Sequence, residues 1–96
     1  MAFELVLSPE AVEDRSRLRA FDRAALDDAL ERHLRHDPMQ LSRTRIKRLK
    51  GMKSPQYRLR ADGLRVLFDV VGQEVQILGI VLKSEAQDWL NASGEP

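Results

Sequence analysis

The sequence contains no cysteine, few aromatic residues and no long apolar run. Without cysteine there is neither a disulfide framework nor a thiolate metal site, which fits a reducing compartment. No apolar run approaches the ~20 residues of a membrane-spanning helix, and the first residues do not resemble a signal peptide. We therefore expect a cytoplasmic protein with no membrane segment. Its 96 residues are enough for a single domain, residues 1–96, with one modest core.

The chain also lacks a large net charge, since its formal charge is only +1, but the charges are unevenly distributed. Residues 1–42 carry nine acidic and six basic residues, whereas residues 43–65 carry nine of the 16 basic residues and a single acid, Asp62. A segment of one sign repels itself unless a polyanion neutralises it. The distribution indicates a polyanion site, with a solvated basic surface as the alternative.

The first 40 residues predict a strand followed by a helical hairpin. Residues 3–7 are the strand candidate. Ser8 and Pro9 are typical of a helix start, and Asp22 is a candidate cap for a second helix that ends before Pro38. The apolar positions recur at helical spacing and predict one packed face: Ala11, Val12, Leu18 and Phe21 in the first helix, and Leu26, Ala29, Leu30, His33 and Leu34 in the second.

His33 and His36 could be read as metal ligands, because they lie three residues apart near the end of the second helix. No carboxylate or cysteine completes the set at a suitable spacing. We expect no metal site and no cofactor, with His33 at the edge of the core and His36 in solvent.

Residues 36–56 form a long basic connection with weak patterning, which Ile46 and Leu49 pin to the body. Long connections in compact domains are usually functional or disordered, and the charge favours a functional one. Four of its basic residues lead into the following strand and are assigned to the anion site: Lys47, Arg48, Lys50 and Lys53.

The segment after residue 56 is typical of a three-stranded antiparallel meander. Residues 57–60 alternate apolar and cationic side chains, Asp62-Gly63 predicts a type I′ turn, and Gly72-Gln73 a type II′ turn. The first turn places Arg60 directly opposite Arg65, with Arg58 two residues along on the same face. Like charges opposed across a ladder cost stability, and a bound phosphate would reverse the sign of that cost.

Continuing the same register through the second turn pairs Phe68 with Ile77, Leu67 with Leu78, Val66 with Gly79, and Arg65 with Ile80. One face then forms the core, and the helices cover only that face. The other face is left bare, with arginines beside an exposed apolar patch that we expect a partner protein to cover: Leu67, Leu78, Ile80 and Leu82.

The C-terminal residues predict a short helix that begins at the capping box from Ser84 to Gln87. We expect Trp89 to anchor packing rather than to stack on bases. Residues 91–96 are expected to fray.

This order of elements, together with Leu49-Lys50-Gly51, Tyr57-Arg58-Leu59-Arg60, Asp62–Phe68 and Val75–Leu78, resembles the RelE/ParE superfamily of bacterial type II toxin–antitoxin toxins along essentially the whole chain. The resemblance implies an α+β fold: an N-terminal strand, a helical hairpin, a three-stranded antiparallel meander and a short C-terminal helix, with the helices on one face of the sheet. It also implies a cognate antitoxin wrapped over the toxin, for which the apolar patch of Leu67, Leu78 and Ile80 is the expected contact.

Members of the RelE branch act as mRNA interferases, which cleave mRNA on the ribosome and inhibit translation. By motif match, Arg60, Arg65 and Lys83 are the expected catalytic residues. Arg58 joins the basic loop residues in RNA binding. Many cleaving members carry a tyrosine or histidine in the C-terminal segment, whereas residues 83–90 here contain neither.

That difference leaves three function hypotheses open. Arginines stabilise charge but transfer protons poorly, and the nearby proton carriers are Lys83, Glu85 and Tyr57. The first hypothesis is an endoribonuclease. The second is a non-enzymatic inhibitor of DNA gyrase, as in the ParE branch, and the third is an inactive module that only binds an antitoxin.

Overall fold

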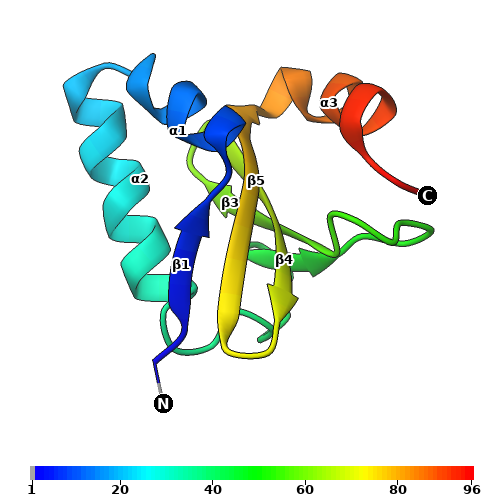
Figure 1. Ribbon diagram of the computed structural model, residues 1–96. Coiled ribbons are helices and arrows are strands. Elements are labelled where there is room, and N and C mark those ends of the chain that lie inside the picture. Colours follow the sequence, from blue (N-terminus) through cyan, green and yellow to red (C-terminus); the bar gives the residue numbers. More distant parts are fainter. Residues whose placement is uncertain (1) are drawn as a thin grey trace.

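The computed structural model describes residues 2–96, which form one mixed sheet covered by helices (Figure 1). The five strands lie in the order β1-β5-β4-β3-β2; β1 is parallel to β5 and the other pairs are antiparallel. The elements are β1 (Glu4–Leu7), α1 (Pro9–Ser16), α2 (Ala20–His33), β2 (Ile46–Arg48), β3 (Tyr57–Ala61), β4 (Leu64–Val71), β5 (Glu74–Leu82), a short 3₁₀ turn η1 (Lys83–Glu85) and α3 (Ala86–Ser93). This confirms the α+β class and the element order expected from the sequence, apart from the additional strand β2.

Helix α1 begins where the sequence predicts, because the Ser8 hydroxyl accepts a hydrogen bond from the Ala11 amide at 3.1 Å. The same hydroxyl donates to the Leu78 carbonyl at 3.2 Å, and Asp14 Oδ2 accepts from the Ile80 amide at 3.1 Å. Helix α1 and its capping residue therefore supply hydrogen-bond partners to backbone groups of β5 beyond the point where β1 ends. In Figure 1, α1 and α3 lie at the same end of β5.

Helix α2 begins earlier than predicted, at Ala20 with Arg19 in the capping position, and no side chain caps its first turn. The prediction that Asp22 is the cap is wrong: its carboxylate accepts from Arg19 Nε at 3.3 Å inside the first turn, where an acid still favours the helix dipole. Phe21 was predicted to join the apolar face of the first helix, but it lies in the first turn of α2 and is 82% exposed.

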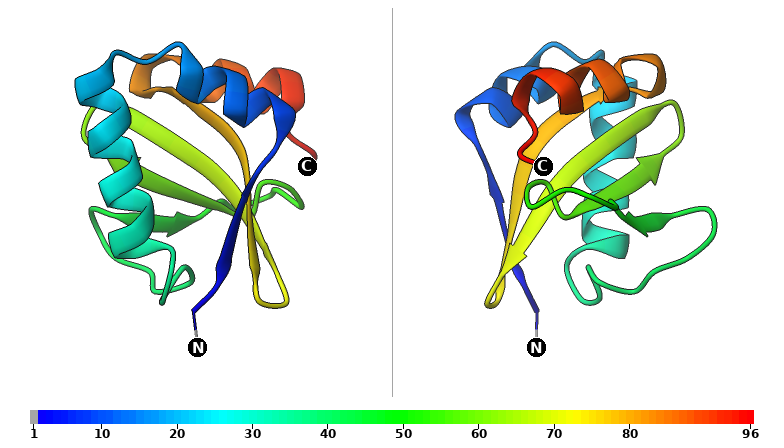
Figure 2. Two further views of the ribbon diagram at one scale, coloured as in Figure 1. Left: turned by 60° about the vertical axis from the view of Figure 1, so that its left-hand side comes forward. Right: turned by 90° about the vertical axis from the view of Figure 1, so that its right-hand side faces the viewer.

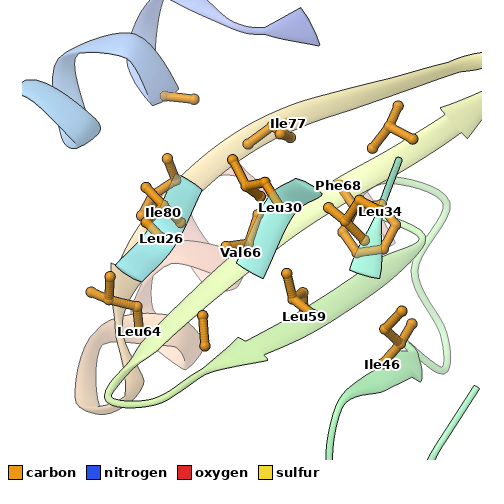
Figure 3. Packing of buried hydrophobic residues seen from close by; sticks show 13 residues of the cluster. Leu26, Leu30, Leu34, Ile46, Leu59, Leu64, Val66, Phe68, Ile77 and Ile80 are labelled. Atoms are coloured by element: carbon orange, nitrogen blue, oxygen red, sulfur yellow. The ribbon is translucent and has the colours of Figure 1, made fainter. Parts of the chain in front are cut away.

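The core lies between α2 and one face of the sheet (Figure 3). As predicted, Leu26 and Leu30 of α2 and Leu34, the C-terminal capping residue of that helix, are buried against it. Tyr57 stacks on Phe68 with ring centroids 5.4 Å apart, which fixes the side of β3 that faces the core. The sheet contributes mainly branched side chains to this layer: Leu59, Val66, Ile77 and Ile80.

The first hairpin of the meander has the predicted register, with Arg60 opposite Arg65 and Arg58 opposite Leu67. Its turn is not type I′, because a left-handed φ of 53° is found at Asp62 but not at Gly63. In the second hairpin Gly72 alone has a positive φ, 60°, as the predicted type II′ turn requires.

The second hairpin keeps the predicted pair Phe68–Ile77, but the register then shifts by one residue between Leu67 and Phe68. Leu67 consequently pairs with Gly79 rather than Leu78, Val66 with Ile80, and Arg65 with Val81. A one-residue shift moves side chains to the opposite face of the sheet. Ile80 therefore faces the core, and Gly79 faces the other side.

The second face is not bare, because α3 packs on it; this corrects both the predicted apolar patch and the prediction that the helices lie on one face of the sheet. Trp89 of α3 packs directly on Gly79, where an added Cβ would come within 2.7 Å of the indole ring atoms Cε2 and Nε1. This confirms Trp89 as a packing anchor. Of the patch residues, Leu67 and Ile80 are buried, Leu78 is half-buried and only Leu82, 51% exposed, is open to solvent.

The C-terminal segment is more ordered than predicted. Helix formation starts with η1, where Glu85 Oε1 accepts from the Leu82 amide at 3.2 Å, so the Ser84 capping box is wrong. After α3, Glu95 pairs with Ser54: the Glu95 amide donates to the Ser54 carbonyl at 2.7 Å and the Lys53 amide to the Glu95 carbonyl at 2.8 Å. Figure 2 shows the C terminus beside the loop between β2 and β3. The prediction that residues 91–96 fray is therefore wrong.

A cationic face on strands β2, β3 and β4

The side of the sheet opposite α2 carries basic residues on three adjacent strands. Lys47 of β2 is paired with Arg58 of β3, and Arg60 of β3 with Arg65 of β4. Residues paired across an antiparallel ladder lie on the same face. We call these four residues the cationic face. Strand β2 was missed at the sequence level because it is only three residues long and two of them are charged.

Arg45 extends the cationic face to the outer edge of the sheet. The Arg60 amide donates to the Arg45 carbonyl at 2.8 Å, which aligns the two residues although Arg45 precedes β2. Arg45 Nη1 also approaches the Arg60 carbonyl at 3.4 Å. The alternation Arg45-Ile46-Lys47 around the buried Ile46 was the sequence signal for this arrangement.

No carboxylate neutralises this face. Five ion pairs are found among residues 2–96, and all lie in the N-terminal helical half: Arg15–Asp27, Arg17–Glu13, Arg19–Asp22, Arg32–Asp28 and Arg35–Glu31. Within that described part of the chain, none of the nine basic residues of the segment 43–65 has a carboxylate oxygen within 4.0 Å. The five acids that form ion pairs are therefore paired within the helical half, and the positive charge of the sheet has no carboxylate partner within 4.0 Å among residues 2–96.

The three arginines differ in exposure. Arg60 is exposed and Arg58 is half-buried, with a buried Nε that has no hydrogen-bond partner among residues 2–96. Arg65 was predicted on an open face but is only 5% exposed, and its Nη1 donates to the carbonyls of Asp62 and Leu64 at 2.9 Å each. Arg65 thus holds the hairpin turn in addition to contributing charge.

Their charges act on one another. Burial lowers the pKa of Arg58, and the charges of Arg65 and then Arg60 lower it further. Burial also lowers the pKa of Arg65, followed by the charge of Arg60. Arg58 and Arg65 nevertheless remain protonated at neutral pH, because an arginine pKa lies far above neutrality. An anion bound between them would relieve this repulsion.

The remaining predicted site residues do not all lie on the cationic face. Arg48 is placed on the opposite side, over the Tyr57 ring at 5.4 Å, and its Nη1 donates to the Gln56 carbonyl at 2.7 Å. Lys50 and Lys53 are exposed in the loop that the C-terminal tail holds. Lys83 follows β5, and its amide donates to the Gly63 carbonyl at 2.9 Å, so its backbone lies at the turn beside Arg65.

This geometry lowers the number of candidate proton carriers. Tyr57 faces the core and stacks on Phe68, as the predicted register required. Glu85 caps the Leu82 amide. Of the three candidates, Tyr57 is engaged in packing and Glu85 in capping, so Lys83 is the remaining candidate proton carrier.

Other site types find no support in the part of the chain that the structure describes. There, no helix has both the length and the apolar character to cross a membrane. No group of three or more histidine, cysteine, aspartate or glutamate side chains is arranged around a point where a metal could bind, across residues 2–96. His33 is half-buried and His36 exposed, as the sequence indicated.

Together, the mixed five-stranded sheet, the helical hairpin and the unneutralised face define a small α+β protein that presents a cationic sheet surface. The fold is that of the RelE toxins. The free E. coli toxin RelE, in the form of a double mutant, superimposes with a TM-score of 0.70 at 22% identity over 95% of this chain and 93% of that one.

Two complexes give similar results. The RelBE2 toxin–antitoxin complex from Mycobacterium tuberculosis matches with a TM-score of 0.68 at 19% identity, covering 86% of this chain and 100% of the other. The RelB–RelE antitoxin–toxin complex from Methanococcus jannaschii matches with a TM-score of 0.65 at 18% identity, covering 88% of this chain and 96% of that chain. No family model and no curated protein matches the sequence. At these identities the comparisons establish the fold.

Proposed function

We propose that this protein is the toxin of a type II toxin–antitoxin system and that its cationic face binds the phosphate backbone of messenger RNA on the ribosome. The observation that carries the proposal is the group formed by Lys47, Arg58, Arg60 and Arg65 on a rigid sheet with no carboxylate partner. Such a face is costly in the free protein and favourable with RNA bound. A cognate antitoxin is the expected protein partner, since solved structures of this fold include RelB–RelE complexes.

The proposed reaction is endonucleolytic cleavage. A ribose 2′-oxygen attacks the adjacent phosphorus and its hydroxyl proton goes to solvent, the P–O5′ bond breaks, and the products are a 2′,3′-cyclic phosphate and a 5′-hydroxyl end. The charge that develops on the phosphate is stabilised by contact with the exposed Arg60 and, through space, by the buried Arg65, whose position the turn carbonyls fix. Lys83, at the same end of the sheet, is the remaining candidate for proton transfer to the leaving oxygen. Arg58, which is half-buried on the same face, adds a further positive charge beside them.

The test is to map mRNA 5′ ends in a translating lysate after adding the protein. Cleavage within codons on ribosomes is expected for the wild type. Arg60→Gln should reduce the cleavage rate by about two orders of magnitude, the effect of removing one charge-stabilising donor. Arg17→Gln is the control, because it removes an exposed charge that is paired with Glu13 and is not part of the cationic face. Intact mRNA in a lysate whose translation has nevertheless stopped would exclude the nuclease.

A second candidate, non-enzymatic inhibition of DNA gyrase, is favoured by one observation. Tyr57 and Glu85 are both committed to packing and capping, which leaves the cationic face poor in proton-transfer groups. A supercoiling assay distinguishes the two functions. Inhibition at micromolar protein with intact mRNA supports the second candidate, and undisturbed supercoiling removes it.

A further inference from the structure

A small polar pocket lies at the outer edge of the sheet, where the end of α2 approaches the segment before β2. Its volume is about 220 Å³, below the range of about 300–1,000 Å³ typical of sites for drug-sized ligands. The pocket is lined mainly by polar side chains: Arg32, His33, Asp37, Gln40, Ser42 and Arg45. None of these residues was assigned a role above except Arg45, which adjoins the cationic face.

Backbone hydrogen bonds hold the Ser42 side chain in place at the pocket. Its hydroxyl oxygen accepts hydrogen bonds from the amides of Arg45 at 2.8 Å and Ile46 at 3.3 Å. Ile46 in turn is buried in the core. A hydroxyl that accepts two backbone bonds still has its own proton to donate, so Ser42 offers a donor whose position the backbone determines.

Arg45 connects the pocket to the cationic face. It is aligned with Arg60 by a backbone hydrogen bond, and its guanidinium is close enough to His33 to act on the charge of that ring. Its hydrogen bond to the Arg60 carbonyl is long, 3.4 Å, and no carboxylate lies within 4.0 Å of it among residues 2–96. An RNA strand on the cationic face that passes over the sheet edge therefore meets Arg45 and then the pocket.

The polar groups of the pocket favour a neutral ligand over a phosphate. Arg32 is paired with Asp28, and Asp37 adds a negative charge beside Arg45, so the positive charges are largely balanced. Donors and acceptors are both present, as in the edge of a nucleobase. Single-stranded RNA is recognised in this way, by stacking on histidine rings or arginine planes and by hydrogen bonds to base edges.

We propose that this edge pocket receives one nucleobase of the RNA whose phosphates lie on the cationic face, and that His33 and Ser42 determine the base preference. The inference rests on the proposed function. His33 suits the role because burial, Arg45 and Arg32 lower its pKa, while only Asp28 opposes them. A neutral imidazole offers one donor and one acceptor, which is a pattern that can read a base edge.

The test measures binding of fluorescently labelled ribo-oligonucleotides of A, C or U to the isolated protein. We expect the wild type to prefer one base by about tenfold, as one or two hydrogen bonds can supply. Both His33→Ala and Ser42→Ala should reduce this preference to about twofold and leave the salt dependence of binding unchanged, because neither residue contacts phosphate. Arg60→Gln is the matched contrast: it should weaken binding of all three oligomers equally and flatten the salt dependence.

A second measurement uses the folded wild type, in which the His33 ring resonance should shift on saturation with the preferred oligomer while the exposed His36 does not. Three outcomes would overturn the proposed base-binding role of the pocket and leave the cationic face intact. They are a base preference that survives both pocket substitutions, a wild type with no base preference, and a His33 resonance that does not shift at saturation. A wild type that binds no oligomer would remove the pocket and the RNA-binding function together.

Discussion

Replacing Arg60 by glutamine should stabilise the free protein, because neighbouring arginines repel its charge and no carboxylate among residues 2–96 offsets that repulsion. Arg60 is exposed and stands directly opposite Arg65, with Arg58 two residues along the same strand. Two like charges roughly 5 Å apart repel by about 1 kcal/mol in water, and more where solvent is displaced. With allowance for the screening of an exposed group, we expect the free energy of unfolding to rise by about 0.5–1 kcal/mol.

Urea denaturation followed by the fluorescence of Trp89, the single tryptophan, measures this change. The midpoint should rise with an unchanged slope, and the gain should shrink at high salt because the repulsion is screened. The control Arg17→Gln removes an exposed pair with Glu13 and should lower stability by no more than about 1 kcal/mol. A lower midpoint for Arg60→Gln, or a gain that salt does not diminish, would show that repulsion across the ladder is not what Arg60 contributes.

Three further experiments test the structure. Arg65→Ala should lower the free energy of unfolding by about 2 kcal/mol in the same urea assay, because two turn carbonyls lose their donor; an unchanged midpoint would show that its burial is unimportant. Gly79→Ala should cost about 1–3 kcal/mol through its clash with Trp89, and Trp89→Leu in the same chain should recover part of the loss; urea denaturation of these variants is followed by circular dichroism, because Trp89→Leu removes the single tryptophan, and strictly additive effects would contradict the contact. Because burial and Arg45 lower the pKa of His33, the unfolded chain binds this proton more readily, and stability should fall as the pH drops below about 6.5. His33→Asn should remove that part of the pH dependence, and parallel pH profiles for the two proteins would refute the assignment.

Local patterns predicted local structure well. The Ser8 cap, the face of α2 that carries Leu26 and Leu30, and the pairing of Arg60 with Arg65 each depend on residues close together in sequence. The arginines of the cationic face follow from the last of these, because a two-residue turn fixes the register of β3 and β4, whereas Lys47 joins them through β2, which the sequence did not predict.

The errors came from interactions distant in sequence. The bulge between Leu67 and Phe68 reverses which face Gly79 and Ile80 occupy, and it is explained by Trp89 packing where the extra residue turns Gly79 outward. No local sequence pattern predicts the contact between Trp89 and Gly79. The pairing of Glu95 with Ser54 is a backbone interaction between segments about forty residues apart, and such pairings have no side-chain pattern.

The burial of Arg65 was also missed for a physical reason. Period-2 alternation assigns a side chain to a face but does not say whether a neighbouring element covers that face. Here η1 and α3 follow β5 at the end where Arg65 pairs with Val81, and the arginine turns to the carbonyls of its own hairpin.

The salt dependence of RNA binding tests the central claim most directly. For a short single-stranded ribo-oligonucleotide, each phosphate contact contributes about 0.7 to the slope of log affinity against log salt. We predict that Lys47→Gln and Arg60→Gln each flatten the slope by about 0.7, and that Arg17→Gln leaves it unchanged. One slope shared by all four proteins, or no binding by the wild type, would contradict the assignment of this face to a nucleic acid.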